Sequence, residues 1–513
     1  MNLFLGIDAS TQGIKTLVID TDSGETAGAS NINFGTDLPE YRSPNGFLEN
    51  PDPLVKEADP LMWVAGLELA LERLKLSGVP MSEIRGISGS GQQHGTVYLN
   101  EKFDDILGHL KNNESLSCQL QQALSRSHSP IWMDRSTTTE CGELMAHFGN
   151  RMQADTGSPT VERFSGPQIR KWAKSAPDAY RATAHIHLVS SFMCSILCGH
   201  SSPIDYGDGA GMNLLNLKNL TWDSEITEFT APGLLRKLPP SVPSGTVAGN
   251  LSAFFTRFGL KEGIPVAVWS GDNPSSLIGV GAGSPGTAVI SLGTSDTFFA
   301  AMRKFKTDSA GCGHVFGNPA GGFMSLICFT NGSLAREKVK DACGIADWQE
   351  FDRLVMESKP GNNGKLMLPY FEAESTPRIL VPGVKYNFND ATKAEKVRAI
   401  MESQALSMRL HSAWQNEEFR RIRVTGGASE SKTFCGILAD VFQSEVEMIA
   451  VKNSAGLGAA LRAANVIGKI SFETLSGMFC ETVDSVHPNR KNAGCYNIML
   501  KDYEELERSA KKK

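Results

Sequence analysis

The sequence predicts an α/β protein made of two related halves, and three observations support this fold class. The chain has 513 residues, of which 41% are hydrophobic, so it exceeds the length at which a single hydrophobic core stops growing. A strand, a polar turn and a second strand occur near the start and again near residue 290. Two strands that end in small residues, at 86–91 and 266–271, also resemble each other. Because this spacing is far too long for a solenoid repeat, we interpret the pattern as the duplication of a domain.

Each half begins with the same order of elements. In the first half, residues 3–8 predict a strand, residues 9–13 a turn rich in hydroxyl groups, and residues 14–20 a second strand. The corresponding strand, turn and strand of the second half are expected at 288–291, 292–296 and 297–302. Each match is short, so the duplication depends on the two halves sharing further features.

The boundary between the halves is expected where turn residues cluster. Pro239, Pro240, Pro243 and Gly245 lie close together, just before a new α/β pattern begins. We therefore expect a first domain over residues 1–245 and a second over residues 246–513.

Bulk properties exclude several classes of protein. The net charge is −6, and Lys and Arg are scattered, so no basic surface for nucleic acid is expected. The first residues lack a basic segment and reach Asp8 early, which is unlike a signal peptide. No stretch approaches the roughly 20 apolar residues of a membrane span. The ten cysteines include no CxxC pair, which favours reduced thiols in a cytoplasmic protein.

Two polar turns suggest a site for a metal and a phosphate chain. No GxxxxGK[ST] segment is present, so the chain is not a P-loop protein. Asp8 ends the first strand, and Thr11 lies in the turn that follows. Taken alone, this pattern favours an ordinary Asx turn. The related turn at Thr294 changes the balance, because two such turns in two related halves could hold one phosphate chain from opposite sides.

Polar side chains also follow the small-residue strand of each half. Asp272 and Asn273 come directly after the apolar strand at 264–269, and His94 follows residues 86–91. A carboxylate at the carboxyl end of a core strand is where an α/β enzyme places a base. The structural alternative, in which Asp272 caps the next helix, is also reasonable. A glutamine pair and a histidine flanked by glycines favour binding of a polar ligand.

A third turn contains the paired glycines Gly426 and Gly427, between an apolar strand and a helix expected to begin near Lys432. Paired glycines allow a flat ring or a phosphate to approach the backbone closely. A simple tight turn would explain the glycines equally well.

These segments, in this order, resemble the FGGY family of carbohydrate kinases, within the actin and hexokinase superfamily. The resemblance covers nearly the whole chain. The five segments that carry it are 6–12, 89–95, 270–274, 291–296 and 425–429. It implies two ribonuclease-H-like α/β domains that flank a central cleft, with the sugar mainly against the first domain and ATP mainly against the second.

The resemblance also implies roles for individual residues. Asp272 would be the catalytic base, and Asp8 would lie near Mg²⁺. The sugar would be bound by His94, Arg163, Asp272 and Asn273. The nucleotide would be bound by Thr11, Thr294, Trp348, Gly426, Gly427, Ala428 and Ser431. The contact from Ser431 is the weakest of these, because members of the family often carry Asn there, which offers both a donor and an acceptor.

Further segments indicate which sugar is the substrate. The stretches 38–41, 132–134, 162–164, 202–206, 209–213 and 331–334 look like those of family members that act on D-xylulose. We therefore expect an ATP- and Mg²⁺-dependent enzyme that makes D-xylulose 5-phosphate, without nucleic-acid or membrane partners, as a monomer or a homodimer. The enzymatic alternatives are kinases for ribulose, gluconate or glycerol, and the non-enzymatic one is a sugar sensor or ATPase of the superfamily.

Overall fold

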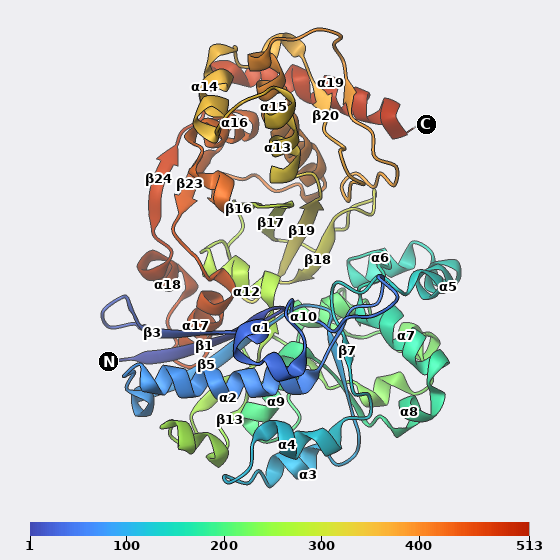
Figure 1. Cartoon of the computed structure of the whole chain (residues 1–513), viewed down its shortest axis with the longest axis vertical. Coiled ribbons are helices and arrows are strands. Elements are labelled where there is room, and N and C mark those ends of the chain that lie inside the picture. Colours follow the sequence, from blue (N-terminus) through green and yellow to red (C-terminus); the bar gives the residue numbers. More distant parts are fainter. Residues whose placement is uncertain (512–513) are drawn as a thin grey trace. The chain divides into compact units, whose positions relative to one another are not determined.

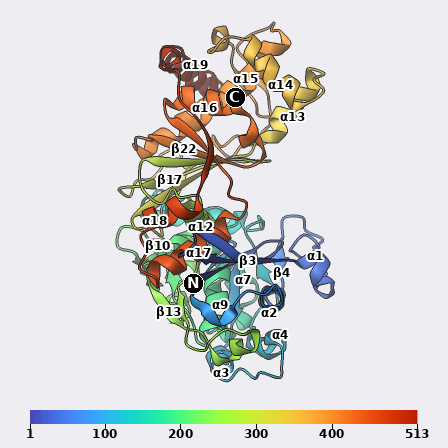
Figure 2. The ribbon, with the colours of Figure 1, turned by 90° about the vertical axis from the view of Figure 1, so that its left-hand side faces the viewer.

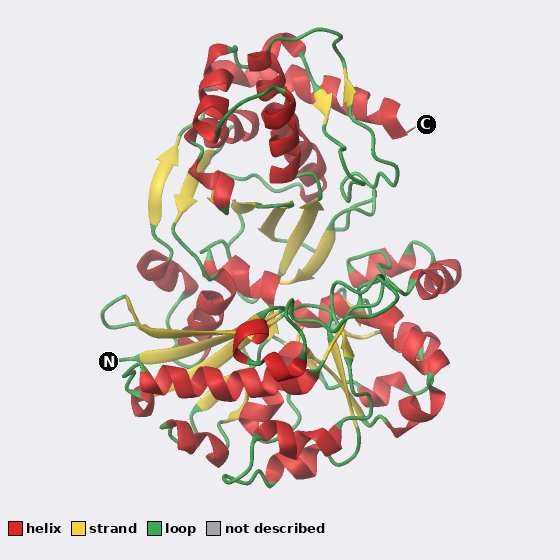
Figure 3. Cartoon of the chain, in the orientation of Figure 1, coloured by secondary structure: helices red, strands yellow, loops and turns green. Residues whose placement is uncertain are grey.

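The computed structural model describes residues 1–511, and the chain forms two compact units that each combine helices and strands (Figure 3). Unit 1 comprises Met1–Gly283, Val315–Phe323 and Lys452–Cys480. Unit 2 comprises Ser284–His314, Met324–Val451 and the segment from Glu481 onward. These bounds differ from the division at residue 245 expected from the sequence, because residues 246–283, 315–323 and 452–480 pack within unit 1.

The centre of unit 1 is a mixed sheet in the order β13–β14–β5–β1–β2–β3, with β15 also paired to β5 (Figure 1). Strand β1 is antiparallel to β2, whereas β5 is parallel to β1, β14 and β15. The strands are β1 (Leu3–Ser10), β2 (Gly13–Asp20), β3 (Glu25–Asn33), β5 (Ile84–Gly91), β13 (Val247–Asn250), β14 (Pro265–Ala267) and β15 (Ser270–Gly271). The pairing of β14 and β15 with β5 explains why the segment beyond residue 245 belongs to unit 1.

Helices cover both faces of this sheet. The odd-numbered residues of β1, such as Leu5 and Ile7, are fully buried in the same apolar core as Met62 and Leu67 of α2 (Pro60–Leu76). The even-numbered residues face α17 (Ser454–Val466), where a Cβ on Gly6 would lie 2.3 Å from the Gly456 carbonyl oxygen. Alternation along the strand therefore places a different helix on each side.

The remaining elements of unit 1 surround this sheet. The helices are α1 (Phe34–Asp37), α3 (Phe103–Gly108), α4 (Leu116–Leu120), α5 (Thr138–Phe148), α6 (Arg151–Thr156), α7 (Ser165–Ser175), α8 (Pro177–Ala182), α9 (Val189–Cys198), α10 (Tyr206–Gly209), α11 (Ser224–Thr230), α12 (Asp272–Gly279) and α18 (Phe472–Phe479). Short strand pairs are β4 (Glu57–Ala58) with β7 (Ser129–Pro130), β6 (Thr96–Leu99) with β8 (His185–Leu188), β9 (Ile204–Asp205) with β12 (Ser241–Val242), and β10 (Leu215–Asn216) with β11 (Thr221–Trp222).

A buried arginine of α17 ties this helix to the sheet. Arg462 is 1% exposed. It donates hydrogen bonds to the backbone oxygens of Gly89, in β5, at 3.1 Å and of Val268, just before β15, at 2.6 Å. The guanidinium therefore holds together the two strands whose ends carry the candidate site residues.

Unit 2 contains a second mixed sheet with the order β19–β17–β16–β22–β23–β24. Strand β16 is antiparallel to β17 and parallel to β22. The strands are β16 (Thr287–Leu292), β17 (Asp296–Met302), β19 (Phe323–Phe329), β22 (Arg421–Thr425), β23 (Glu445–Ile449) and β24 (Thr482–Val486), with the short pair β20 (Met367–Leu368) and β21 (Lys385–Tyr386). Strand β18 (His314–Gly317) lies where the chain passes from unit 2 to unit 1.

The helices of unit 2 gather on one face of its sheet (Figures 1 and 2). They are α13 (Ser333–Ala342), α14 (Trp348–Glu357), α15 (Lys393–Ser412), α16 (Lys432–Phe442) and α19 (Ala493–Lys511). The central strand triplets match between the units: β2–β1–β5 in unit 1 and β17–β16–β22 in unit 2 have the same order and the same strand directions. Two α/β units with related sheets are what the sequence predicts.

Candidate active site

In unit 1, three neighbouring strands bring the predicted residues to one edge of the sheet. Asp8 in β1 pairs with Ser90 in β5, and Ser270 in β15 pairs with the same serine from the other side. Because the three strands are parallel, their carboxyl ends meet at one edge. The turn after β1, the segment containing His94 after β5, and Asp272 after β15 all begin at that edge.

Asp8 is a buried carboxylate, and one of its two oxygens lacks a hydrogen bond. It is 4% exposed, and its Oδ1 atom has no hydrogen-bond partner among the described residues. Burial raises the pKa of Asp8 from 3.8 to about 6, and the positive charge of Lys15 and the hydroxyls of Ser90 and Ser10 oppose the rise. A buried carboxylate with one oxygen that lacks a full hydrogen bond is suited to a cation, which would supply a further interaction.

Asp272 is the first residue of α12, and Gly271 occupies the cap position, so the capping role considered from the sequence is wrong. Asp272 Oδ1 accepts hydrogen bonds from the backbone nitrogen of Asn273 at 2.8 Å and from its Nδ2 at 3.0 Å. Burial, and then repulsion from Asp8, raises the pKa of Asp272 to about 7. The residue keeps some accessible surface, as a base that must reach a substrate requires.

The imidazole of His94 is fixed by contacts on several sides. Its Nδ1 donates to the carbonyl oxygen of Gly211 at 2.8 Å, and its ring centroid lies 4.4 Å from that of Phe164. The guanidinium of Arg163 lies over the same Phe164 ring, at 5.6 Å from its centroid. Because Nδ1 is the donor, Nε2 of a neutral His94 is an acceptor suited to a hydroxyl group. Packing against Phe164 therefore brings together the two residues predicted to bind sugar.

The hydroxyl of Thr11 already has protein partners. Its Oγ1 accepts from Trp132 Nε1 at 2.8 Å and donates to Gln92 Oε1 at 3.4 Å. Thr11 thus belongs to the same strand-end cluster as Asp8, with its side chain held in one orientation.

Buried polar atoms without a hydrogen-bond partner gather around these strand ends. Among the residues that the structure describes, they include Asp8 Oδ1, Ser90 Oγ, Gln92 Nε2, Gln93 Nε2, Asp208 Oδ1 and Ser270 Oγ. Buried polar groups in folded proteins are nearly always paired with protein or with water. This concentration of unpaired atoms indicates a site built for polar ligands.

Gln93 and Asp208 are members of this cluster that are absent from the predicted set. Gln93 Oε1 accepts from Asn273 Nδ2 at 2.7 Å, which links the end of β5 to the start of α12. Asp208, in α10, is fully buried near Gly271 and Gln93. No local pattern reveals a buried aspartate, and the only signal for Asp208 is the glycine-rich run that follows it at 209–213.

In unit 2, the two predicted turns lie side by side. Strands β16 and β22 are parallel, with Ser291 paired to Thr425, so the turn containing Thr294 and the turn containing Gly426 leave the same edge of the sheet. Gly426 has φ 93°, and a Cβ there would lie 2.4 Å from the Leu292 carbonyl oxygen. Only glycine fits this position. Thr294, Gly426 and Gly427 are exposed, so the turns are accessible to a ligand.

The other predicted nucleotide residues surround the second turn. Ser431 is the cap of α16, where its Oγ accepts from the Phe434 backbone nitrogen at 3.1 Å and donates to Asp352 Oδ1 at 2.9 Å. The Ser431 hydroxyl therefore makes both of these hydrogen bonds within the protein. Asp352 lies one helical turn after Trp348 in α14, and the Trp348 side chain is 44% exposed. The hydrogen bond between Ser431 and Asp352 therefore links α14 to the segment that follows the glycine turn. Ala428 lies between the paired glycines and Ser431 in the sequence.

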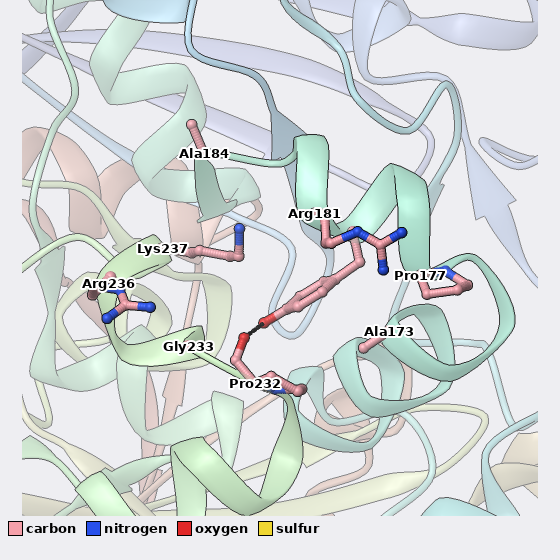
Figure 4. Close-up of a pocket in the computed structure, with 9 residues that line it drawn as sticks. Ala173, Pro177, Arg181, Ala184, Pro232, Gly233, Arg236 and Lys237 are labelled. Carbon is pink, nitrogen blue, oxygen red and sulfur yellow. Dashed lines mark hydrogen bonds between the residues drawn. The ribbon is translucent and has the colours of Figure 1, made fainter.

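A surface cavity of about 460 Å³ lies elsewhere in unit 1, and Figure 4 shows the basic side chains along it. Lys237 donates to the Thr183 carbonyl oxygen, and Tyr180 Oη donates to the Pro232 carbonyl oxygen at 3.1 Å. Arg181 pairs with an aspartate on its own helix. These three side chains are held by protein partners, and none of the predicted site residues lines the cavity.

Family models match both parts of the chain. Residues 3–279 match the N-terminal domain of the FGGY family of carbohydrate kinases, and residues 288–466 match its C-terminal domain. The chain belongs to this family. It is therefore a carbohydrate kinase, a phosphotransferase that acts on an alcohol group, and kinases of the FGGY family use ATP.

Curated relatives resemble this FGGY kinase over nearly their full length. Xylulose kinase 2 of Arabidopsis thaliana is 36% identical, with 99% of this chain and 97% of the relative covered. Xylulose kinase of Rattus norvegicus is 37% identical, with 98% and 96% covered. The chain is thus a xylulose kinase-like member of the family.

Solved structures of two sugar kinases share the fold. A xyloylose kinase from Brucella ovis has a TM-score of 0.83 at 23% identity, and covers 99% of both chains. A gluconate kinase from Lactobacillus acidophilus has the same TM-score at 18% identity, with 99% and 98% covered. At these identities the likeness establishes the fold alone. Within residues 1–511, no helix combines the length and the hydropathy needed to cross a membrane.

Proposed function

We propose that this FGGY kinase transfers the γ-phosphate of ATP to the terminal O5 hydroxyl of D-xylulose, giving D-xylulose 5-phosphate. The observation that carries the proposal is the full-length likeness to xylulose kinases at 36–37% identity. The gluconate kinase has an equally similar fold, so the fold itself does not select the sugar.

Asp272 acts as the general base in this proposal. It accepts the proton of the sugar hydroxyl while that oxygen attacks the γ-phosphate, and ADP leaves. Asn273 holds one carboxylate oxygen of Asp272 through two donors, and the Gln93 backbone also interacts with this carboxylate, so the base is held in one orientation. A pKa near 7 suits a base that works near neutral pH.

His94 and Arg163 bind the sugar in unit 1, together with Asn273. His94 is held by Gly211 and by Phe164, so its ring has a fixed orientation. Preorganised side chains limit the entropy lost when a small polar ligand is bound. Phosphoryl transfer needs little covalent help from protein, so such positioning accounts for much of the catalysis.

The exposed turns of unit 2 bind ATP. The backbone around Gly426, Gly427 and Ala428 lets the nucleotide approach closely, and Thr294 faces the phosphates from the neighbouring turn. Trp348 and Ser431 lie at the edge of this site. Because the Ser431 hydroxyl is committed to Phe434 and Asp352, its contribution is to shape the site.

Asp8 holds Mg²⁺, together with water and phosphate oxygens. The Oδ1 atom of Asp8 lacks a hydrogen bond, and burial raises the pKa of the group. Both features fit a carboxylate that binds a cation. Within residues 1–511, no group of three or more His, Cys, Asp or Glu side chains could hold a metal. A single carboxylate with waters and phosphates is a usual environment for this ion. When bound, Mg²⁺ neutralises charge on the phosphates.

A substrate panel tests the proposed function. Purified protein is assayed for ADP release with D-xylulose, L-ribulose, D-gluconate and glycerol, and Asp272→Asn protein measures background ATP hydrolysis. We expect the highest kcat/KM for D-xylulose. A clearly higher value for another sugar or polyol would contradict the substrate and leave the family unchanged.

Substitutions at His94 and Arg163 test which ligand these residues bind. His94 has φ 71°, a conformation that Asn tolerates better than Ala, so His94→Asn and Arg163→Ala are the suitable variants. Each should raise the KM for sugar, or lower kcat/KM for sugar, by roughly 10–100-fold, because a buried polar contact is lost. The KM for ATP should stay near the wild-type value.

Arg181→Ala is a matched control, because it removes an exposed arginine of unit 1 that lines the surface cavity. It should leave both KM values unchanged. If His94→Asn or Arg163→Ala altered only the KM for ATP, the assignment of that residue to the sugar would be wrong.

A further inference from the structure

We propose that Asp208 is a positioning residue that orients the Gln93 amide so that Gln93 holds Asn273 beside Asp272. The inference rests on the proposed function, because it treats Asp272 as the base. Asp208 itself touches neither substrate nor the reacting atoms in this scheme.

The first step is the link from Asp272 to Gln93. Asn273 Nδ2 lies 3.0 Å from Asp272 Oδ1 and 2.7 Å from Gln93 Oε1, and it donates to both. An amide nitrogen carries two hydrogens, so one group can serve both acceptors. Gln93 therefore determines where Asn273 can hold the carboxylate.

The second step is the orientation of Gln93. Because its oxygen accepts from Asn273, its nitrogen must point to the other side, where Asp208 lies. Gln93 Nε2 and Asp208 Oδ1 each lie 2.8 Å from the point that a Cβ on Gly271 would occupy. The Gln93 amide lowers the pKa of Asp208, as a nearby donor does, and neither Gln93 Nε2 nor Asp208 Oδ1 has a full hydrogen bond to any of the described residues.

The third step is the rigidity of Asp208. The residue has no exposed surface. Its Oδ2 lies 2.5 Å from Ser190 Oγ, and its backbone nitrogen donates to Asp205 Oδ1 at 2.9 Å. Contacts from α9 and from the residue that precedes α10 thus fix the carboxyl group, and its free oxygen faces Gln93.

The fourth step is the charge of Asp208. Burial raises its pKa well above the ordinary value, the Ser190 hydroxyl opposes the rise, and the carboxylates of Asp205 and Asp272 increase it. The remaining charged group nearby is the buried Arg462, whose guanidinium donates to backbone oxygens of the sheet. The Ser190 hydroxyl donates to Asp208 Oδ2, so Oδ1 is the oxygen that can accept from Gln93.

The atoms of the contact determine which substitution should preserve it. An asparagine at position 208 has nearly the same shape as aspartate and keeps an acceptor oxygen for Gln93, whereas alanine has none.

The test is a double-mutant cycle with an isosteric rescue. Asp208→Asn, Asp208→Ala, Gln93→Ala and the Asp208→Ala/Gln93→Ala double variant are assayed with D-xylulose and ATP. Asp208→Ala should lower kcat about 10–100-fold, since a small misplacement of catalytic groups is costly, with the KM for ATP unchanged. Asp208→Asn should stay close to wild type. In the Gln93→Ala background, Asp208→Ala should have little further effect, because both act through the same contact.

Tyr496→Phe is the matched control. Tyr496 Oη donates to Glu402 Oε1 at 2.7 Å in a buried pair of a hydroxyl and a carboxylate, like that of Ser190 and Asp208, but this pair lies in unit 2. It should change thermal stability without changing kcat. If Tyr496→Phe lowered kcat as much as Asp208→Ala, the Asp208 effect would be structural.

Three outcomes overturn the inference: wild-type kcat in Asp208→Ala, loss of activity in Asp208→Asn equal to that in Asp208→Ala, or simple additivity with Gln93→Ala. A crystal structure of the Asp208→Ala protein tests the inference without an activity assay. The Asn273–Gln93 hydrogen bond should be lost, and its retention would refute the inference. Failure of the proposed function is separate, because it appears as absent turnover of D-xylulose in the wild type or as normal kcat in Asp272→Asn.

Discussion

Replacing Asp272 with Asn should lower kcat by on the order of 10²-fold or more, while the protein still folds and binds both ligands. The Asn side chain has nearly the same shape and can accept the same bonds from Asn273, but it cannot take up the proton of the sugar hydroxyl. The alternative of Asp272 as a helix cap predicts near-normal turnover, and it conflicts with the position of Gly271 as the cap of α12.

Asp272→Asn should also differ from the wild type in how its thermal stability depends on pH. The pKa of Asp272 is raised from 3.8 to about 7 in the folded protein, so the folded state binds more protons than the unfolded state between about pH 4 and pH 7. Stability therefore falls as pH rises through this window. Asn cannot ionise, so Asp272→Asn should have a higher thermal midpoint than the wild type at pH 8, and the difference should shrink toward pH 4.

These expectations are checked on one purified variant by the thermal midpoint at both pH values and by kcat in the ADP-release assay. Isothermal titration with ATP and with sugar establishes that binding is retained. A near-normal kcat would eliminate Asp272 as the base, and a loss of stability at pH 8 would indicate that its carboxylate serves the fold.

Replacing Asp8 with Asn should also reduce turnover by on the order of 10²-fold, because the charge of a buried carboxylate is lost where a cation is proposed to bind. Asn retains the size of Asp and one carbonyl oxygen, so the strand pairing of β1 with β2 and β5 should be preserved. The remaining activity should require a higher concentration of Mg²⁺ than the wild type does.

The measurement is turnover against Mg²⁺ concentration for wild type and variant, after removal of metal with a chelator. Asp20→Asn is a matched control, since Asp20 ends β2 at the far end of the same hairpin, where its Oδ1 accepts from the Asn2 backbone nitrogen. The control should keep the wild-type Mg²⁺ dependence. An identical dependence in Asp8→Asn would remove Asp8 from the metal site.

Local chemistry in the sequence determined the hairpin turns and most of the candidate residues. The strand at 3–8 and the turn before 14–20 correspond to β1 and β2, and the later pair corresponds to β16 and β17. Alternation of apolar residues and the turn preferences of Gly, Ser and Asp act over a few residues. Asp8, His94 and Asp272 could be proposed for the same reason, since Asp8 lies near the end of β1, His94 shortly after β5, and Asp272 directly after β15.

The extent of each unit depended on tertiary structure. The Pro and Gly cluster at 239–245 marks a break in the chain, but β14 and β15 then return to pair with β5 of the first half. A proline cluster shows where regular structure stops and carries no information on which distant strand the next segment joins.

Tertiary structure also decided which polar groups act together. Gln93, Asp208 and Asn273 are separated by 65 residues or more in the sequence and meet only because β5, α10 and α12 pack within one unit. Likewise, the hydroxyl of Ser431 is committed to Asp352 only because α14 packs beside α16. Local preferences determine the strand ends and turns, whereas burial and pairing between distant segments determine which side chains share a hydrogen bond and which remain available to a ligand.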